Sequence, residues 1–277
     1  WNKLDGFDEL FFPAYFEDTD LAFRVRQLGY KVVYQPLSVV THFEGISHGT
    51  DENSGQKRYQ TINRQRFLDR WKEVLNSDHY DNAQNVFLAR ERSKTKKQVL
   101  VIDHYVPHFD KDGGSRSTFS YLKLLVEMGF NVKFIGDNFF RHETYTTISQ
   151  QMGIEVLYGN FYSTSVNKWI IENGLYFDIV IAHRMHIAPK YLDVLKKHTH
   201  AKLAYIGHDL QFLSSLRKYE LTKELSHKED VEKFKSIEKR IFNTVDIILP
   251  FSSYEAPFIK EIVPDKIVKT IPVFFFQ

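Results

Sequence analysis

The sequence of 277 residues contains no cysteine and no long apolar run. Without thiols there is no disulfide framework and no thiolate metal site, which agrees with a reducing compartment and leads us to expect a cytoplasmic protein. The longest apolar stretches, such as Val99–Ile102 and Ile179–Ala182, are the length of a strand and too short to span a bilayer. The opening residues Trp1–Asp5 have neither the basic start nor the apolar core of a secretory signal.

An excess of charge of either sign is also missing. The 37 Lys and Arg residues nearly balance the 35 Asp and Glu residues, for a net charge of +2, and the two signs are interleaved. Nucleic-acid binders concentrate basic residues on one face, so we expect no nucleic-acid partner. The densest basic stretch, Arg90–Lys97, is typical of a solvated connector. No clear basic amphipathic block indicates membrane docking, and peripheral association with the inner face of the plasma membrane is left open.

The pattern of apolar residues divides the chain into regions 1–92 and 98–277, joined by a linker at 93–97. The sequence begins within a motif-bearing segment and stops on the apolar segment Pro272–Gln277, so we expect a piece of a longer protein. The first region should hold several helices and few strands. Its expected elements are a helix over Thr19–Leu28, strands over Lys31–Tyr34 and Ser38–His42, a long helix over about Glu52–Leu75 and a helix over Asp81–Arg92.

The second region alternates short apolar strands with amphipathic helices. Strands are expected at Val99–Asp103, Asn131–Ile135, Glu155–Leu157, Ile179–Ala182, Ala201–Ile206, Ile247–Leu249 and Ile267–Thr270. Helices are expected at Ser115–Met128, Thr144–Met152, Ser165–Asn173, Ala188–Lys197, Lys228–Thr244 and Tyr254–Ile262. This alternation predicts an α/β fold with a Rossmann-like parallel sheet that is covered on both faces.

Acidic residues cluster at the start of the first predicted helix. Asp18 stands at the expected N-cap and Asp20 in the first turn, where unpaired N–H groups and the helix dipole favour carboxylates. A carboxylate in that place is also suited to act as a general base, because it can take the proton from an acceptor hydroxyl that attacks a sugar. Position alone leaves both interpretations open. The nearby aromatic residues, which would form either core or a floor for a sugar ring, are Phe11, Phe12, Tyr15 and Phe16.

A longer string of residues carries a resemblance to a known family. In order, it consists of Asp5-Gly6-Phe7-Asp8-Glu9, Phe11-Phe12, Glu17-Asp18-Thr19-Asp20-Leu21, Arg24, Gly29-Tyr30, Pro36, His42, Glu44, Gly45 and Ser47. The string resembles the C-terminal half of a family 2 glycosyltransferase with the GT-A fold, over roughly residues 1–75. The resemblance implies that the Glu17-Asp18 pair supplies the catalytic base, with Asp18 as the base itself. It further implies that His42 ligates a divalent metal and that Asp8 and Glu9 lie beside the bound sugars.

The sequence departs from that family at one point. The nucleotide-binding strand and the Asp-x-Asp metal motif of the family belong upstream of Gly6, and the chain has neither. A single imidazole binds Mg²⁺ or Mn²⁺ poorly, since these hard ions take several oxygen ligands. We therefore expect the GT-A part to need Mg²⁺ or Mn²⁺ in an intact enzyme, and not to bind a donor by itself.

A glycine turn follows the first strand of the second region. After a polar loop with Pro107, the pair Gly113-Gly114 opens a helix, and without Cβ atoms the backbone there admits a phosphate or a sugar closely. A plain capping turn explains the same residues. The loop also carries acidic and histidine side chains, which we interpret as a polar loop rather than a metal cluster; these are Asp103, His104, His108, Asp110 and Asp112.

The longer pattern again resembles a family. Gly113-Gly114, Gly129-Phe130-Asn131-Val132, Tyr205-Ile206-Gly207-His208-Asp209-Leu210, and Ala256 after Ser252-Ser253 are similar to the N-terminal half of a family 4 glycosyltransferase with the GT-B fold, over about 97–277. The resemblance implies that the glycine pair approaches a donor diphosphate, that His208 lies near the reacting sugar, and that no metal is needed. The pair His183-Arg184 ends another strand at the same sheet edge, where open α/β sheets bind ligands.

Together these patterns predict a partial GT-A domain fused to a GT-B N-terminal domain. Such a bifunctional glycosyltransferase would transfer sugars from nucleotide-sugar donors to a cell-surface polysaccharide or lipid-linked glycan. A non-catalytic glycan- or partner-binding scaffold with transferase-like folds is the alternative. An NAD-dependent oxidoreductase is disfavoured, because the G-x-G-x-x-G fingerprint is absent.

Overall fold

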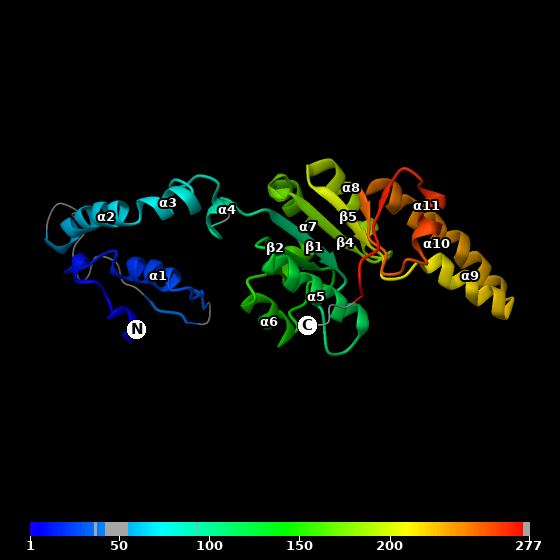
Figure 1. Cartoon of the computed structure of the whole chain (residues 1–277), viewed down its shortest axis with the longest axis horizontal. Coiled ribbons are helices and arrows are strands. Elements are labelled where there is room, and N and C mark those ends of the chain that lie inside the picture. The colour runs from blue at the N-terminus through cyan, green and yellow to red at the C-terminus, as the bar shows by residue number, and fades with distance from the viewer. Residues whose placement is uncertain (36–37, 42–54, 93, 274–277) are drawn as a thin grey trace. The chain divides into compact units, whose positions relative to one another are not determined.

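A computed structural model of the chain describes residues 1–35, 38–41, 55–92 and 94–273. It divides into two compact units, Trp1–Asn82 and Ala83–Gln277. Figure 1 labels the α-helices of both units and several strands of the second.

The described part of the first unit is helical. Its elements are η1 (Asn2–Leu4), η2 (Glu9–Phe11), α1 (Glu17–Gln27), η3 (Gly55–Lys57), α2 (Arg58–Arg70) and α3 (Lys72–Asp78). The single long helix expected up to Leu75 is therefore wrong, because the backbone breaks at Trp71, which ends α2 and caps α3.

The strand predicted over Lys31–Tyr34 is also wrong, and 38–41 is not a strand either. The β-branched residues there point to a strand, but a strand needs a partner for its backbone groups. Val33 is 76% exposed and Val40 is 84% exposed, so these segments pack against no sheet in the described part of the chain.

A buried carboxylate organises the first unit. Asp20 is fully buried and accepts hydrogen bonds from the Trp71 indole at 2.8 Å and from Arg24 Nε at 2.7 Å. The Arg24 guanidinium also donates to the carbonyls of Leu4 and Gly6, both at 2.8 Å. These bonds hold the N-terminal segment, α1 and α2 together around an aromatic core of Phe11, Phe23, Phe67 and Trp71.

The second unit is built on a seven-stranded parallel sheet, as the alternating pattern predicted. Its strands are β1 (Gln98–Asp103), β2 (Asn131–Gly136), β3 (Glu155–Leu157), β4 (Ile179–His183), β5 (Lys202–Ile206), β6 (Ile247–Ile248) and β7 (Ile267–Val268). The strand order is β3-β2-β1-β4-β5-β6-β7, and every neighbouring pair is parallel. The chain moves outward from β1 to β3 and then returns to the other side of β1, so the order reverses between β1 and β4.

Alternation along the strands supplies apolar side chains to both faces. On β1, Val99 and Val101 join one core cluster, whereas Leu100 and Ile102 join the other. The helices are α5 (Gly113–Glu127), α6 (Tyr145–Gln151), α7 (Asn160–Asn173), α8 (Ala188–His198), α9 (Gln211–Thr222), α10 (Leu225–Thr244) and α11 (Ala256–Ile262). Helices α5 and α6 pack on the first face, and α7, α8 and α10 on the second.

Two expectations about helices in this unit are corrected. Helix α9 was not predicted; it forms an antiparallel pair with α10, and Figure 1 shows the two side by side. The helix expected over Asp81–Arg92 shrinks to α4 (Val86–Ala89), because left-handed residues such as Asn85 precede it.

The compact-unit boundary falls between Asn82 and Ala83, ahead of the linker expected at 93–97, because the intervening segment packs on the second unit. Lys133, fully buried on β2, donates to Glu91 and to Glu155, each at 2.6 Å. Phe87 stacks on Tyr176 with ring centroids 4.6 Å apart.

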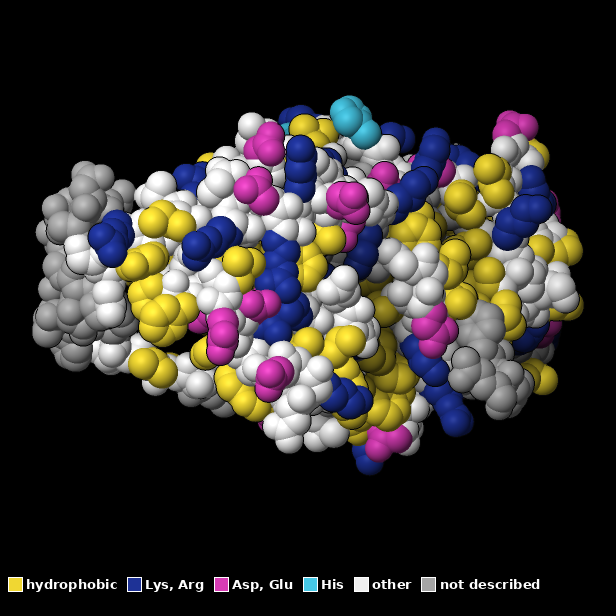
Figure 2. Space-filling model, turned by 60° about the vertical axis from the view of Figure 1, so that its left-hand side comes forward, with side chains coloured by type: hydrophobic (Ala, Val, Ile, Leu, Met, Phe, Trp, Pro, Cys, Tyr) yellow, Lys and Arg dark blue, Asp and Glu magenta, His cyan; other side chains and the backbone are white. Residues whose placement is uncertain are grey.

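The surface carries mixed charge. Figure 2 shows Lys and Arg side chains interspersed with Asp and Glu side chains on the face in view, in agreement with the near-neutral composition. In the described part of the chain, none of the helices combines the length and the hydropathy that a membrane span requires.

Candidate functional site

The polar residues of the second unit gather where its strand order reverses. In open parallel sheets, ligands bind beyond the carboxyl ends of the strands at such a point, since the flanking loops part there. Asp103 ends β1 and His183 ends β4, its neighbour across the reversal. Arg184 follows β4 directly, and His208 lies two residues after β5.

Asp103 is the buried anion of this edge. Its Oδ1 accepts from Arg184 Nε at 2.6 Å and from the His104 N–H at 2.7 Å, and its Oδ2 accepts from Thr118 Oγ1 at 3.0 Å. Burial by itself would raise the pKa of the carboxyl, but His183, Arg184 and His208 lower it, and the resulting pKa is about 2. At neutral pH Asp103 is therefore ionised, and Arg184 is the cation that balances it.

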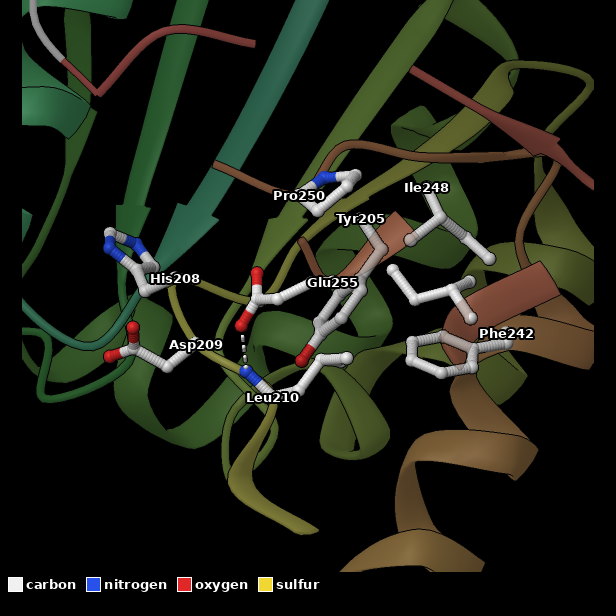
Figure 3. A pocket seen from close by; sticks show the side chains of 10 residues that line it. Tyr205, His208, Asp209, Leu210, Phe242, Ile248, Pro250 and Glu255 are labelled. Carbon is white, nitrogen blue, oxygen red and sulfur yellow. Dashed lines mark hydrogen bonds between the residues drawn. The ribbon is translucent and has the colours of Figure 1, made fainter. Parts of the chain in front are cut away.

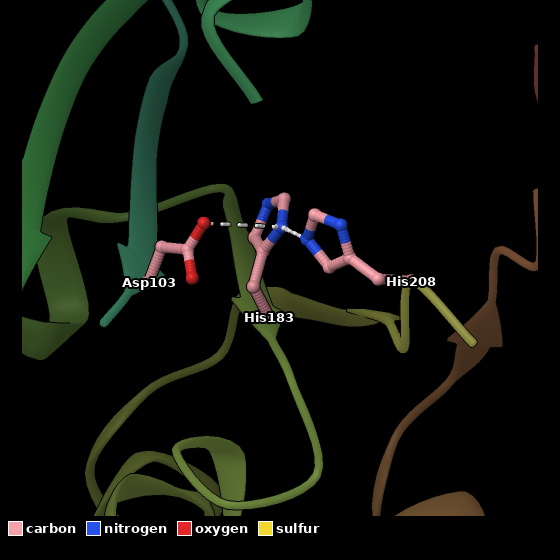
Figure 4. Close-up of side chains that lie close together, drawn as sticks. All are labelled: Asp103, His183 and His208. Atoms are coloured by element: carbon pink, nitrogen blue, oxygen red, sulfur yellow. Dashed lines mark hydrogen bonds and ion pairs between the residues drawn. The ribbon is translucent and has the colours of Figure 1, made fainter. Parts of the chain in front are cut away.

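Two histidines meet beside this carboxylate, as Figure 4 shows. The Nδ1 atom of His183 lies 3.1 Å from Nε2 of His208 and 3.8 Å from Oδ2 of Asp103. Burial lowers the pKa of His183 to about 4 and, together with the neighbouring His183 and Arg184, lowers that of His208 to about 3. Both imidazoles are therefore neutral at neutral pH, and the contact between them is a hydrogen bond that holds one proton.

Gly114 brings the start of α5 into the same group. A Cβ atom built on Gly114 would lie 3.1 Å from Arg184 Nη2, 3.2 Å from His208 Nδ1 and 3.3 Å from Asp112 Oδ1. A side chain there would have to displace one of these groups. The predicted residues Gly114, Arg184 and His208 thus meet at the start of α5, with Gly113 next in sequence. The small space that a side chain of Gly114 would fill is called the gap below, and Asp112 borders it as well.

Backbone strain marks the same two strand ends. Arg184 has φ +60° and His208 has φ +70°, a left-handed conformation that residues with a Cβ seldom adopt. The Arg184 N–H donates to the Ile206 carbonyl at 2.9 Å, which fixes the two turns to each other. Strain of this kind concentrates at binding and catalytic sites, where the surrounding structure imposes it.

The neighbouring helix start, that of α9, is already occupied by the protein's own carboxylates. Glu255 accepts from the Leu210 N–H at 2.8 Å, and Glu238 accepts from the N–H groups of Gln211 and Phe212 at 2.9 and 3.3 Å. Burial raises the pKa of Glu238 to about 7, although the two N–H bonds act against it. An external anion would have to displace both glutamates at α9, whereas at the start of α5 one carboxylate, that of Asp112, accepts from the Ser115 N–H.

A small cavity of about 10 Å³ lies against this arrangement, and Figure 3 shows its lining. Its wall includes the hydroxyl-bearing Tyr205, together with His208, Leu210 and Glu255. The volume suffices for about one water molecule, so the cavity is too small for a substrate. A wider, open hollow of about 650 Å³ lies at the start of α5, where Asp112, Gly113 and Arg116 are among the residues that line it.

The metal-binding capacity of the edge is limited. Asp103, His183 and His208 form the one group of three potential ligands found among the described residues. Both oxygens of Asp103 accept hydrogen bonds, and the two histidines contact each other. A metal ion held by these three residues would therefore replace the contact between the histidines.

The acidic residues Asp110 and Asp112 of the polar loop have partners within the second unit. Asp112 caps α5 by accepting from the Ser115 N–H at 2.7 Å, and Asp110 accepts from the Tyr145 hydroxyl at 2.6 Å. His108 stacks on Tyr145 with ring centroids 4.3 Å apart.

The residues predicted in the first unit are less closely grouped. Asp18 was expected to be the N-cap of α1, but Phe16 occupies that position. Asp18 is an exposed residue of the first turn and accepts a hydrogen bond from the Thr19 N–H at 2.6 Å. Glu17 begins the helix and Glu9 begins η2, and no hydrogen bond or ion pair joins either to Asp18 in the described part of the chain.

Asp8 and His42 complete the predicted set. Asp8 accepts from the Leu10 N–H at 2.9 Å and from Arg70 at 2.7 Å, and these two donors, in that order, lower its pKa. It therefore has a structural role. His42, the predicted metal ligand, lies outside the described residues.

Comparison with known proteins assigns neither a family nor an activity to the chain. No protein-family model and no curated protein matches the chain. Among solved structures, the chain is similar to that of UGT73P12 from Glycyrrhiza uralensis, a UDP-glycosyltransferase complexed with glycyrrhetinic acid 3-O-monoglucuronide, at 9% identity and a TM-score of 0.42. The match covers 65% of this chain and 49% of the other, so the chain spans about half the length of that structure. A likeness this distant assigns no activity.

Proposed function

We propose that the second unit, Ala83–Gln277, is the acceptor-side half of a glycosyltransferase that uses a nucleotide-sugar donor. Its sheet edge at Gly114 would receive the diphosphate of the donor, and the acceptor would be a surface polysaccharide or lipid-linked glycan. The grouping at Gly114 is the observation that carries this proposal, because a helix start, a guanidinium and an imidazole converge there on a position without a side chain. The one carboxylate at the same position, that of Asp112, is engaged by the Ser115 N–H.

The chemistry of the gap suits a phosphate-bearing ligand. Unpaired N–H groups at a helix start attract anions, and a guanidinium binds two phosphate oxygens at once. Arg184 uses Nε for Asp103, and its Nη2 lies 3.1 Å from the Cβ position of Gly114. The buried Asp103 therefore fixes the guanidinium with its outer edge toward the ligand.

For the first unit we retain inverting sugar transfer with Asp18 as the base. Two nearby carboxylates are already engaged, Asp8 with Arg70 and Asp20 with Arg24. Asp18 is exposed, and among the described residues it accepts hydrogen bonds only from Thr19. The described residues of this unit contain no group of three metal-ligating side chains close enough to hold an ion. A requirement for Mg²⁺ or Mn²⁺ therefore depends on residues outside the described ones and stays a prediction.

Calorimetric titration tests the proposal for the second unit. UDP, GDP, dTDP and inorganic pyrophosphate would each be added to the whole chain and to the Arg184→Ala and Arg184→Lys variants. We expect at least one nucleoside diphosphate to bind, at least tenfold more weakly after Arg184→Ala than in the unchanged chain. Arg184→Lys keeps the charge that balances Asp103, so it separates loss of binding from loss of fold.

A matched control is Arg240→Ala, which removes an exposed arginine paired with Asp193 far along α10. It should leave binding unchanged. Equal affinity of the unchanged chain and a folded Arg184→Ala variant would contradict the proposal, as would absence of binding by any of the four probes. Binding of a glycan without any nucleoside diphosphate would instead support a non-catalytic scaffold.

A further inference from the structure

The contact between His183 and His208 determines where the protons of both rings lie. A neutral imidazole has one N–H and one acceptor nitrogen, so the 3.1 Å contact from His183 Nδ1 to His208 Nε2 holds one proton. Either His183 donates it and His208 Nδ1 carries the second proton, or His208 donates it and its Nδ1 is bare. The two arrangements give His208 opposite roles toward a ligand.

Asp103 decides between them. Its ionised Oδ2 lies 3.8 Å from Nδ1 of His183, the same atom that meets His208. A proton on that nitrogen places a positive hydrogen between the carboxylate and the neighbouring ring, whereas a bare nitrogen would turn its lone pair toward a buried negative charge. At low local dielectric this difference is large. The His183 proton therefore lies on Nδ1.

The consequence reaches the gap at Gly114. If His183 donates to Nε2 of His208, the remaining proton of His208 is on Nδ1, which lies 3.2 Å from the Cβ position of Gly114. The structure gives this nitrogen no hydrogen-bond partner among the described residues. A donor in that place is complementary to an oxygen of the ligand. Arg184 is the cation that borders the same gap.

We propose that His183 is a positioning residue, which together with Asp103 holds His208 with its proton on Nδ1, so that His208 donates a hydrogen bond to an oxygen of the ligand rather than acting as a base. The identity of the ligand rests on the proposed function; the position of the proton does not. His183 itself is 1% exposed and reaches the ligand only through His208.

Nitrogen-15 NMR of the whole chain with labelled histidine tests the position of the proton without a ligand. The His208 signals are assigned by their loss in His208→Gln. We expect Nδ1 of His208 to have the chemical shift of a protonated ring nitrogen and Nε2 that of a bare one at neutral pH. The reverse assignment in the unchanged chain would overturn the inference, whatever the outcome of the nucleotide titrations.

Variants of His183 connect the tautomer with binding. His183→Asn keeps an N–H donor near the position of Nδ1, whereas His183→Leu removes it. We expect His183→Asn to keep the affinity for pyrophosphate within about threefold, and His183→Leu to lose about tenfold or more and to shift the His208 signals. Equal affinity of the two folded variants would contradict the positioning role. The control His186→Leu, at the same sheet edge, should leave the His208 tautomer unchanged.

Discussion

Replacement of Gly114 by alanine should separate the stability of the second unit from its binding of ligand. Gly114 is the second residue of α5 and has no left-handed backbone, so alanine is compatible with its conformation. Glycine in a helix costs up to about 1 kcal/mol relative to alanine. The added methyl lies 3.1–3.3 Å from three side-chain ends, which must give way by a few tenths of an ångström and offset part of that gain.

We therefore expect Gly114→Ala to change the free energy of unfolding by less than about 1 kcal/mol, or a few degrees in melting temperature for a unit of this size. Affinity for the nucleoside diphosphate that binds the unchanged chain should fall at least tenfold, or about 1.4 kcal/mol, because the methyl occupies the approach of the ligand. Differential scanning calorimetry and isothermal titration on the same preparations measure the two effects.

Ser120→Ala is the matched control, since it replaces another residue of α5 whose hydroxyl bonds only within the helix, to the Arg116 carbonyl. It should preserve binding and change stability slightly. Unchanged affinity in Gly114→Ala would refute the reasoning, because it would show that the ligand does not approach the backbone at this glycine. A large loss of stability would show that the side chains around the gap cannot move.

Three further outcomes follow from the packing and the charges. Lys133→Met should destabilise the second unit by about 3 kcal/mol or more in urea unfolding, since Glu91 and Glu155 lose their shared cation. The control Lys123→Met, on the exposed side of α5, should cost under about 0.5 kcal/mol. Similar losses of stability in the two variants would contradict the role of Lys133. Folding lowers the pKa of His183 to about 4 and that of His208 to about 3, from about 6.5 in the unfolded chain. The unfolded chain therefore binds more protons below pH 6.5, so the contribution of these neutral rings to stability is complete above pH 6.5 and is lost as the pH falls from 6.5 toward 4. His208→Gln should reduce the slope of stability with pH in that range by up to about 1.4 kcal/mol per pH unit, and an unchanged slope in urea unfolding at pH 7 to 5 would disprove the assignment. In the first unit, Asp20→Asn should cost about 3 kcal/mol by fluorescence-detected unfolding, because it weakens the bonds to Trp71 and Arg24, whereas the exposed Asp18→Asn should cost under about 0.5 kcal/mol; equal losses would mean that Asp18 also has a structural role.

The sheet of the second unit was predictable because its signal is local. Runs such as Val99–Ile102 and Ile179–Ala182 are apolar throughout, which indicates strands covered on both faces, and amphipathic helices separate them. The seven predicted strands all exist, with ends shifted by a residue or two. The order of the strands within the sheet depends on the direction in which the chain crosses from each strand to the next. It could be read only from the structure.

Features that depend on distant partners were not predictable. Lys133 in the middle of an apolar strand gives no sign in the sequence that two glutamates neutralise it. The segment 31–34 has the composition of a strand, but a strand requires a neighbour, and composition does not supply one. Asp20 was placed in the first turn of its helix, yet its burial depends on Trp71, which lies far along the chain.

The candidate site was predicted in part. Gly114, Arg184 and His208 were singled out, and the structure places them around one gap. Asp103 and His183 were named only as a residue of the polar loop and as the end of a strand. Their contacts with Arg184 and His208 were missed, because these residues act through their neighbours and end different strands. A weak signal was present, since a charged or titratable residue that ends a buried parallel strand faces the edge where ligands bind.

The most direct test of the central claim is a titration of the ¹⁵N-labelled whole chain with the nucleoside diphosphate that binds it most tightly, followed by NMR. We expect the largest shifts on Gly113, Gly114 and the side chains of Arg184 and His208. We expect little change around Lys133, in the first half of β2. Shifts centred on the start of α9, or spread over the surface without the Gly114 signals, would contradict that claim.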